Sequence, residues 1–147
     1  MTDSGEVLLE VDGGVAVVTL NAPDRRNALT PAMADELIAT FDEVDARADV
    51  GALVIKATGK SFCAGGDIAT LTSAGLDPAA PDAYEGMGRI YDSFYRLGQV
   101  RVPTVAAVRG SAVGNFRKEV VNGAVGWDVA TQFERPAQMW SMRRSAR

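Results

Sequence analysis

Histidine is absent from this chain of 147 residues, and cysteine occurs only once, at Cys63. Without histidine the chain cannot form a Ser-His-Asp or Cys-His nucleophile system, nor a histidine-based metal site. A single cysteine excludes an internal disulfide framework, and without an activating imidazole we expect Cys63 to be a small buried side chain. Acid–base chemistry would have to come from carboxylates, lysine, tyrosine or water, and we predict no metal site.

Long apolar runs are missing as well. No stretch reaches the roughly 20 apolar residues of a membrane-spanning helix. The first six residues, MTDSGE, are acidic and lack the basic and apolar regions of a signal peptide. Hydrophobic residues make up 47% and charged residues 23% of the chain, a balance typical of one globular domain with its own core. We therefore expect a cytoplasmic protein that binds no membrane.

Charge is distributed unevenly along the chain. Residues 115–147 carry six basic and three acidic side chains, a net charge of +3, and they include both tryptophans. Because the whole chain has a net charge of −4, the first 114 residues carry −7. A basic segment of this kind indicates either an anionic partner or a stretch of different coding origin.

The first 50 residues contain a hairpin pattern and a helix pattern. β-branched runs at residues 7–11 and 15–20 flank an Asp-Gly-Gly turn, which predicts a hairpin with a turn slightly longer than the minimum. Thr30 and Pro31 form a typical helix start, and apolar side chains then recur at helical spacing to about residue 48. The apolar face of this predicted helix consists of Met33, Leu37, Ile38, Phe41 and Val44.

Two apolar runs are each followed by a glycine turn. Residues 52–57 predict a buried strand that leads into SFCAGGDI at 61–68, and residues 104–108 predict a second buried strand that leads into RGSAVG at 109–114. A helix with Asp82 as its N-cap is predicted between them. Its core face would be formed by Met87, Ile90, Tyr91, Phe94 and Leu97. Because a helical crossover makes the strands parallel, both turns should lie at the same edge of a sheet.

The glycine pair Gly65-Gly66 has two interpretations. A tight turn that needs glycine is the commoner one. A strand-to-helix junction of this kind also leaves N–H groups unpaired and lets a ligand approach the backbone. If the two turns converge, their N–H groups and the positive end of a helix would hold a developing negative charge on one oxygen atom.

Three motifs in order carry a resemblance to a known family. NAL at 27–29, FCAGGDI at 62–68 and PTVAAVRGSAVG at 103–114 resemble the enoyl-CoA hydratase/isomerase (crotonase) family from about residue 7 to 114. The resemblance implies an α/β fold of repeated ββα units, assembled as a homo-oligomer (a trimer or hexamer). It implies acyl-CoA thioesters as substrates, in fatty acid metabolism. It also implies that coenzyme A is part of the substrate, with no separate cofactor and no nucleic-acid partner.

The resemblance also assigns site residues. The catalytic positions are those of two main-chain N–H donors to the thioester carbonyl, Ala64 and Asn115. Losing one such donor typically costs about 3–4 kcal/mol of transition-state stabilisation. For Arg25 and Arg26, plain surface charge is as good an explanation as a phosphate contact. The residues implied in binding coenzyme A are Arg26, Ala28, Ala64, Gly66, Asp67 and Ile68.

The match ends after Gly114. The family places a catalytic glutamate where this chain has Lys118, and Glu119 is one position away, a rotation of about 100° on a helix. A second glutamate belongs to a later segment of the family. We therefore expect residues 1–114 to be the N-terminal part of a crotonase-like domain. Residues 115–147 would be an atypical basic tail, disordered or loosely attached.

Truncation and inactivity follow from that departure as expectations. A shift of reading frame or a truncated gene would produce such a change at 114/115, and a family-like continuation in another frame of the coding DNA would show it. One alternative is a non-catalytic acyl-CoA binder or partner subunit. Another is an interaction module whose basic tail binds an anionic surface. In each case uncovered strand edges predict poor solubility or dependence on oligomerisation.

Overall fold

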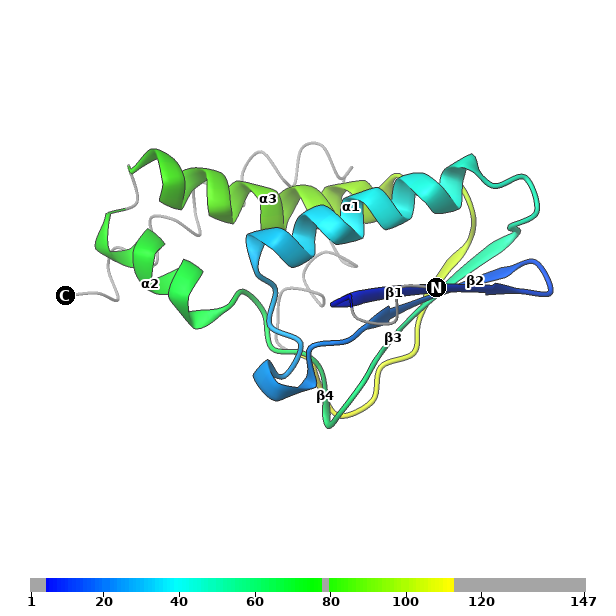
Figure 1. Ribbon diagram of the computed structural model, residues 1–147, viewed down its shortest axis with the longest axis horizontal. Helices are drawn as coiled ribbons and strands as arrows, with labels where there is room; N and C mark the ends of the chain where they lie inside the picture. The colour runs from blue at the N-terminus through cyan, green and yellow to red at the C-terminus, as the bar shows by residue number, and fades with distance from the viewer. Residues whose placement is uncertain (1–4, 78–79, 113–147) are drawn as a thin grey trace.

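Two helices cover one face of a four-stranded sheet (Figure 1). The computed structural model describes residues 5–77 and 80–112, so the predictions for residues 115–147 lie outside the described residues. The sheet has the strand order β1-β2-β3-β5, and a second, two-stranded sheet pairs β4 with β6. Along the chain the elements form β1-β2-α1 and then β3-β4-α2-α3, which are the predicted repeated ββα units.

The hairpin is tighter than the sequence predicted. Strands β1 (Val7–Asp12) and β2 (Val15–Leu20) are antiparallel, and Asp12 pairs with Val15. The turn is therefore the minimum of two residues, Gly13 and Gly14, with φ of +55° and +82°. The prediction of a longer turn was wrong because two consecutive glycines reach the left-handed region without penalty and match the twist of the strands.

Helix α1 (Pro31–Ala46) starts at the predicted residue and ends two residues early. The Thr30 hydroxyl accepts a hydrogen bond from the Met33 N–H at 3.1 Å and so caps the helix. The predicted face packs on the sheet, although Ile38 is only half-buried. Figure 1 shows α1 beside α3 on the same face, and the two helices are joined there by Asp35–Arg89 and Asp42–Arg96 ion pairs.

Helix α3 (Pro81–Gly98) follows α2 (Ile68–Leu76) and forms the crossover. Its N-cap is Ala80, so the prediction of Asp82 was wrong. Proline fits the first helical position best, which leaves Asp82 within the first turn. The aromatic and aliphatic face of α3 belongs to the core, as predicted: Met87, Ile90 and Tyr91 are buried, and Phe94 and Leu97 pack against them.

The two predicted strands on either side of the crossover are parallel neighbours. Strand β3 (Ala52–Ala57) lies between β2 and β5 (Thr104–Ala106). β3 is half-buried to buried along most of its length, whereas all three residues of β5 are exposed, with Val105 at 60%. The prediction that residues 104–108 are buried was wrong. Within the described part of the chain β5 is an edge strand paired on one side only, and apolar content cannot distinguish an edge from a centre.

Three short elements have no clear sequence signal. They are η1 (Pro23–Arg25), β4 (Ser61–Cys63) and β6 (Ser111–Ala112). β4 and β6 pair in parallel and carry the two glycine motifs. No helix in residues 5–77 or 80–112 has the length and apolarity that crossing a membrane requires.

Candidate functional site

The pairing of β4 with β6 brings the two glycine motifs side by side. Ser61 pairs with Ser111 and Cys63 with Ala112. Gly110 makes this approach possible because its φ is +72° and a Cβ built there would overlap the main-chain carbonyl of Lys60. The two motifs therefore lie at one edge, as the crossover predicted. The position of Asn115, the predicted second donor, lies outside the described residues.

The turn after β4 is held by the segment at residues 26–29. The Ala64 N–H donates to the Arg26 carbonyl at 3.1 Å, and the Asp67 N–H donates to the Leu29 carbonyl at 2.9 Å. In the other direction the Leu29 N–H donates to the Gly65 carbonyl at 2.7 Å. The turn is thus tied at both ends to a segment almost 40 residues earlier in the chain.

This bonding decides which N–H groups of the turn remain available. The Ala64 N–H is engaged with Arg26, and the Gly65 N–H donates to the Cys63 sulfur at 3.4 Å. The Gly66 N–H has no acceptor among the described residues, and Gly66 is half-buried. Gly65 has a φ of +94°, which only glycine adopts readily. Within the described part of the chain, the N–H of this turn that stays without an acceptor is therefore that of Gly66, two residues beyond Ala64.

Helix α2 begins directly behind Gly66. The Asp67 carboxylate accepts from the N–H groups of Ala69 at 3.0 Å and Thr70 at 3.3 Å, and it also accepts from the Thr70 hydroxyl. Asp67 therefore acts as the N-cap of α2. The positive end of the helix dipole lies next to Gly66 and favours negative charge there. Ile68, which the resemblance assigns to coenzyme A binding, is 81% exposed at this helix start.

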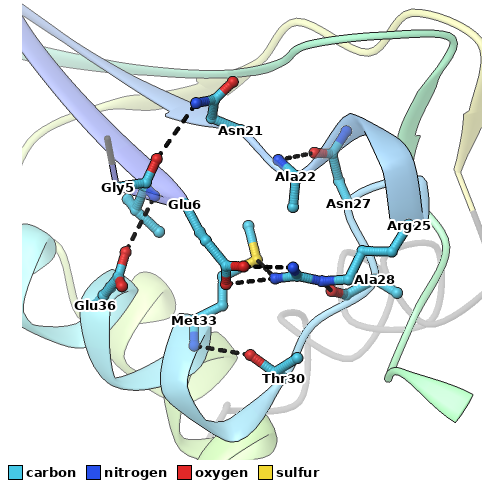
Figure 2. A network of polar contacts seen from close by, with 11 residues as sticks. Gly5, Glu6, Asn21, Ala22, Arg25, Asn27, Ala28, Thr30, Met33 and Glu36 are labelled. Carbon is cyan, nitrogen blue, oxygen red and sulfur yellow. Dashed lines mark hydrogen bonds and ion pairs between the residues drawn. The ribbon is translucent and has the colours of Figure 1, made fainter. Parts of the chain in front are cut away.

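The loop before α1 is held in place by an ion pair (Figure 2). Arg25 makes a bidentate pair with Glu6, and its Nε donates to the Ala28 carbonyl at 2.9 Å. The hydrogen bond from Arg25 lowers the pKa of Glu6, and the same bond raises the pKa of Arg25. The Arg25 guanidinium is thus occupied within the protein. Arg26 is exposed, and Ala28 is buried.

Asn27 belongs to the NAL motif, but the sequence alone assigned no structural or functional role to its side chain. Its side chain is completely buried and makes three hydrogen bonds. Asn27 and its neighbour Arg26 are the non-glycine residues with positive φ among the described residues, at +54° and +57°. Asparagine in an NAL motif after a Pro-Asp turn was the available signal, since asparagine tolerates this conformation better than most residues.

Cys63 is buried, as predicted. It is 4% exposed, and burial raises the pKa of its thiol, so the thiolate that a nucleophile requires is disfavoured. The side chain borders a small apolar cavity of about 20 Å³ between the sheet and the two helices. Among the described residues no group of His, Cys, Asp or Glu side chains is arranged to hold a metal ion.

Comparison with known proteins identifies the family. A model of the enoyl-CoA hydratase/isomerase family matches residues 10–115, and the chain belongs to this family. It is 43% identical over 114 residues to "Probable enoyl-CoA hydratase EchA14" of Mycobacterium tuberculosis, covering 78% of this chain and 43% of that protein. It is 32% identical over 111 residues to the 1,2-epoxyphenylacetyl-CoA isomerase of Escherichia coli, covering 74% and 41%.

Solved structures support the fold. An enoyl-CoA hydratase/isomerase from Xanthobacter autotrophicus aligns with a TM-score of 0.62 at 36% identity, over 72% of this chain and 39% of that one. PA4980 of Pseudomonas aeruginosa aligns with a TM-score of 0.64 at 35% identity, over 78% and 48%. The predicted family and the crotonase-like α/β fold are thus confirmed. The chain spans less than half the length of the relatives it matches.

Proposed function

We propose that this chain binds acyl-CoA thioesters and stabilises the enolate-like charge that develops on the thioester oxygen. The observation that carries the proposal is the Gly66 N–H just before α2, which has no acceptor in residues 5–77 and 80–112 and lies in a turn held by main-chain hydrogen bonds at Ala64 and Asp67. A preorganised donor at a helix start favours an oxyanion without having to reorganise. Family membership points to the same substrate class.

The first donor in this proposal is Gly66 rather than Ala64. The Ala64 N–H would have to leave the Arg26 carbonyl before it could bind a ligand. Asn115 remains the proposed second donor, because it follows β6 by three residues and β6 pairs with β4. A second N–H from that side would complete a two-donor site of the kind that acyl transfer and enolate chemistry use.

The coenzyme A moiety is proposed to lie along the loop at residues 26–28 and the start of α2. Exposed Arg26 would contact a phosphate group of coenzyme A. The small residues Ala28, Ala64 and Gly66 would let the rest of the coenzyme A moiety approach the backbone closely. Asp67 would act indirectly, since its carboxylate caps α2. Ile68 would contact the ligand through its exposed side chain. Coenzyme A is here part of the substrate.

Binding of the thioester is not sufficient for hydration or isomerisation of a double bond. Either reaction also needs a group that transfers a proton to carbon. The resemblance places Lys118 where the family has its glutamate, which favours a second candidate function: a non-catalytic acyl-CoA binder or partner subunit. We propose further that the protein works as a homo-oligomer in the cytoplasm. The exposed β5 residues Val105 and, just beyond the strand, Val108 are consistent with burial in an assembly.

Binding is tested with acetoacetyl-CoA, whose enolate absorbs in the near ultraviolet, titrated against the full chain. We expect an enolate band to appear with acetoacetyl-CoA, and tighter binding than for free coenzyme A, which has no carbonyl to hold. Equal affinity for the two ligands without an enolate band would contradict the proposal.

Turnover is tested separately with crotonyl-CoA. Hydration removes the conjugated double bond, so its absorbance falls as the reaction proceeds. We expect no loss beyond that in buffer, together with measurable binding, which would support the non-catalytic candidate. Turnover well above buffer would instead show that a proton-transfer group exists.

A further inference from the structure

The side chain of Asn27 is a fully satisfied buried polar group. Its Oδ1 accepts from the Ala22 N–H at 2.8 Å, and its Nδ2 donates to the carbonyls of Thr58 at 2.9 Å and Ser61 at 2.8 Å. These bonds use both amide donors and the carbonyl acceptor. Thr58 follows β3 and Ser61 begins β4, so one side chain joins the loop before α1 to both ends of the β3–β4 connection.

The backbone of Asn27 is as constrained as its side chain. Both Arg26 and Asn27 are left-handed, a conformation that side chains disfavour and that concentrates at functional sites. The peptide group between these two residues carries the carbonyl that accepts the Ala64 N–H. Its direction depends on the ψ of Arg26 and the φ of Asn27. If the pair relaxed to right-handed values, this carbonyl would turn away from the turn after β4.

The position of the Gly66 donor therefore depends on Asn27. Ala64 is held by Arg26, Asp67 is held by Leu29, and the Gly65 N–H donates to the Cys63 sulfur. The Gly66 N–H is therefore fixed in place without an acceptor among the described residues. We propose that Asn27 is a positioning residue for the Gly66 N–H. It holds segment 26–29 in the conformation whose carbonyls accept the N–H groups of Ala64 and Asp67. The Gly66 N–H is then left to donate to a thioester oxygen. The role at a thioester rests on the proposed function.

Few other residues could take this place. Aspartate matches the shape of asparagine but has no N–H to give to the carbonyls of Thr58 and Ser61, and its charge would be buried against them. Serine offers a single donor that is too short to reach two carbonyls. Glycine adopts the left-handed backbone but makes none of the three bonds. Asn27→Gly therefore removes the side-chain bonds and keeps the backbone conformation accessible.

The experiment compares amide hydrogen exchange, residue by residue, in the full wild-type chain and in Asn27→Gly. Asn21→Ala is the matched control, since Asn21 lies in the same loop and its Nδ2 donates to the Gly5 carbonyl (Figure 2). Its Oδ1 accepts from the Thr58 hydroxyl, and it makes no bond to Ser61 among the described residues. We expect exchange at Ala64 and Asp67 to accelerate roughly tenfold or more in Asn27→Gly, as the loss of buried hydrogen bonds implies. The amides of β2, paired on both sides, should change far less.

The outcomes separate positioning from simple stabilisation. If exchange accelerates equally at Ala64, Asp67 and β2, Asn27 only stabilises the fold and the inference is overturned. Should Asn27→Gly fail to fold, the wild type still decides: exchange at Ala64 and Asp67 as fast as at Gly66 overturns the inference. Asn27→Asp, which keeps the acceptor for Ala22, then serves as the second variant and should show the same local acceleration.

A ligand measurement adds the functional readout. In Asn27→Gly the affinity for acetoacetyl-CoA should fall at least tenfold more than that for free coenzyme A, whereas Asn21→Ala should leave their ratio unchanged. Equal losses for the two ligands overturn the positioning role at the oxyanion. If the wild type fails to distinguish the two ligands, the proposed function fails, while the exchange data still decide whether Asn27 holds the turn.

Discussion

The two glycine motifs of this chain follow the same local pattern, an apolar strand and then a glycine turn, but they are supported differently. The first, which follows β3 and the short β4, is tied by three main-chain hydrogen bonds to residues 26–29 and is half-buried. The second, after β5, follows an exposed edge strand and meets the first through the β4–β6 pairing and the close contact of Gly110 with Lys60. Local pattern thus sets the shape of a turn, and tertiary contacts set how firmly it is held.

The largest effect should come from removing the donor of the first turn. Gly66→Pro deletes the N–H, and we expect the affinity for the acetoacetyl-CoA enolate to fall about 100-fold or more, the usual loss for one such donor. Gly66→Ala keeps the N–H, and its Cβ would meet Leu71 at 3.4 Å, an ordinary contact. Titration of both variants with acetoacetyl-CoA measures the two affinities. Similar losses of affinity in the two variants would mean that the added side-chain volume, and not the missing N–H, weakens binding.

Gly110 tests how the second turn depends on the first. Gly110→Ala forces a left-handed alanine and an overlap with the Lys60 carbonyl, so the free energy of unfolding should fall by about 3 kcal/mol. Gly13→Ala is the matched control, because Gly13 is also left-handed but a Cβ there meets nothing, and it should cost only about 1–2 kcal/mol. Urea unfolding measures both. Equal costs would show that the two motifs are not packed together.

The Glu6–Arg25 pair should make the support of the first turn dependent on pH. The folded pKa of Glu6 is lower than its ordinary value of 4.5, so the ionised carboxylate stabilises the fold above that pH. This stabilisation is lost as the pH falls through the folded pKa. Because the two side chains are about a third exposed, solvent screening limits it to about 0.5–1 kcal/mol. Glu6→Gln should be destabilised by that amount at pH 7, and its difference from the wild type should shrink steadily as the pH falls below 4.5, as measured by urea unfolding.

The smallest effect concerns the strained backbone beside Asn27. Arg26→Gly relieves a left-handed side chain at the cost of a more flexible unfolded chain, and we expect a net stabilisation of about 0.5 kcal/mol. Thermal unfolding measures it, with Arg25→Gly as the contrast, since Arg25 is not left-handed and holds Glu6. A destabilised Arg26→Gly would mean that the arginine side chain contributes to holding the loop.

Elements with strong local signals could be predicted from the sequence. The hydroxyl cap at Thr30, the boundaries of β3, the hairpin and the apolar face of α3 all follow from side-chain chemistry within a few residues. Local signals do not reach features that distant contacts decide. The predicted burial of β5 was wrong because the strand lies at the edge of the sheet. That the Ala64 N–H donates to the carbonyl of Arg26 depends on a residue 38 positions earlier in the chain.

By itself, the sequence of this chain determined its family, the order of its longer strands and helices and the presence of two glycine turns, since these depend on residue type and spacing. The tertiary structure alone decided which N–H group of the first turn stays without an acceptor among the described residues. That choice depends on the hydrogen bonds from residues 26–29 and on the buried amide of Asn27 that fixes them. Every residue except proline has a main-chain N–H, so the residue type does not indicate whether that N–H is hydrogen-bonded. Only the neighbouring acceptors in the folded structure decide it.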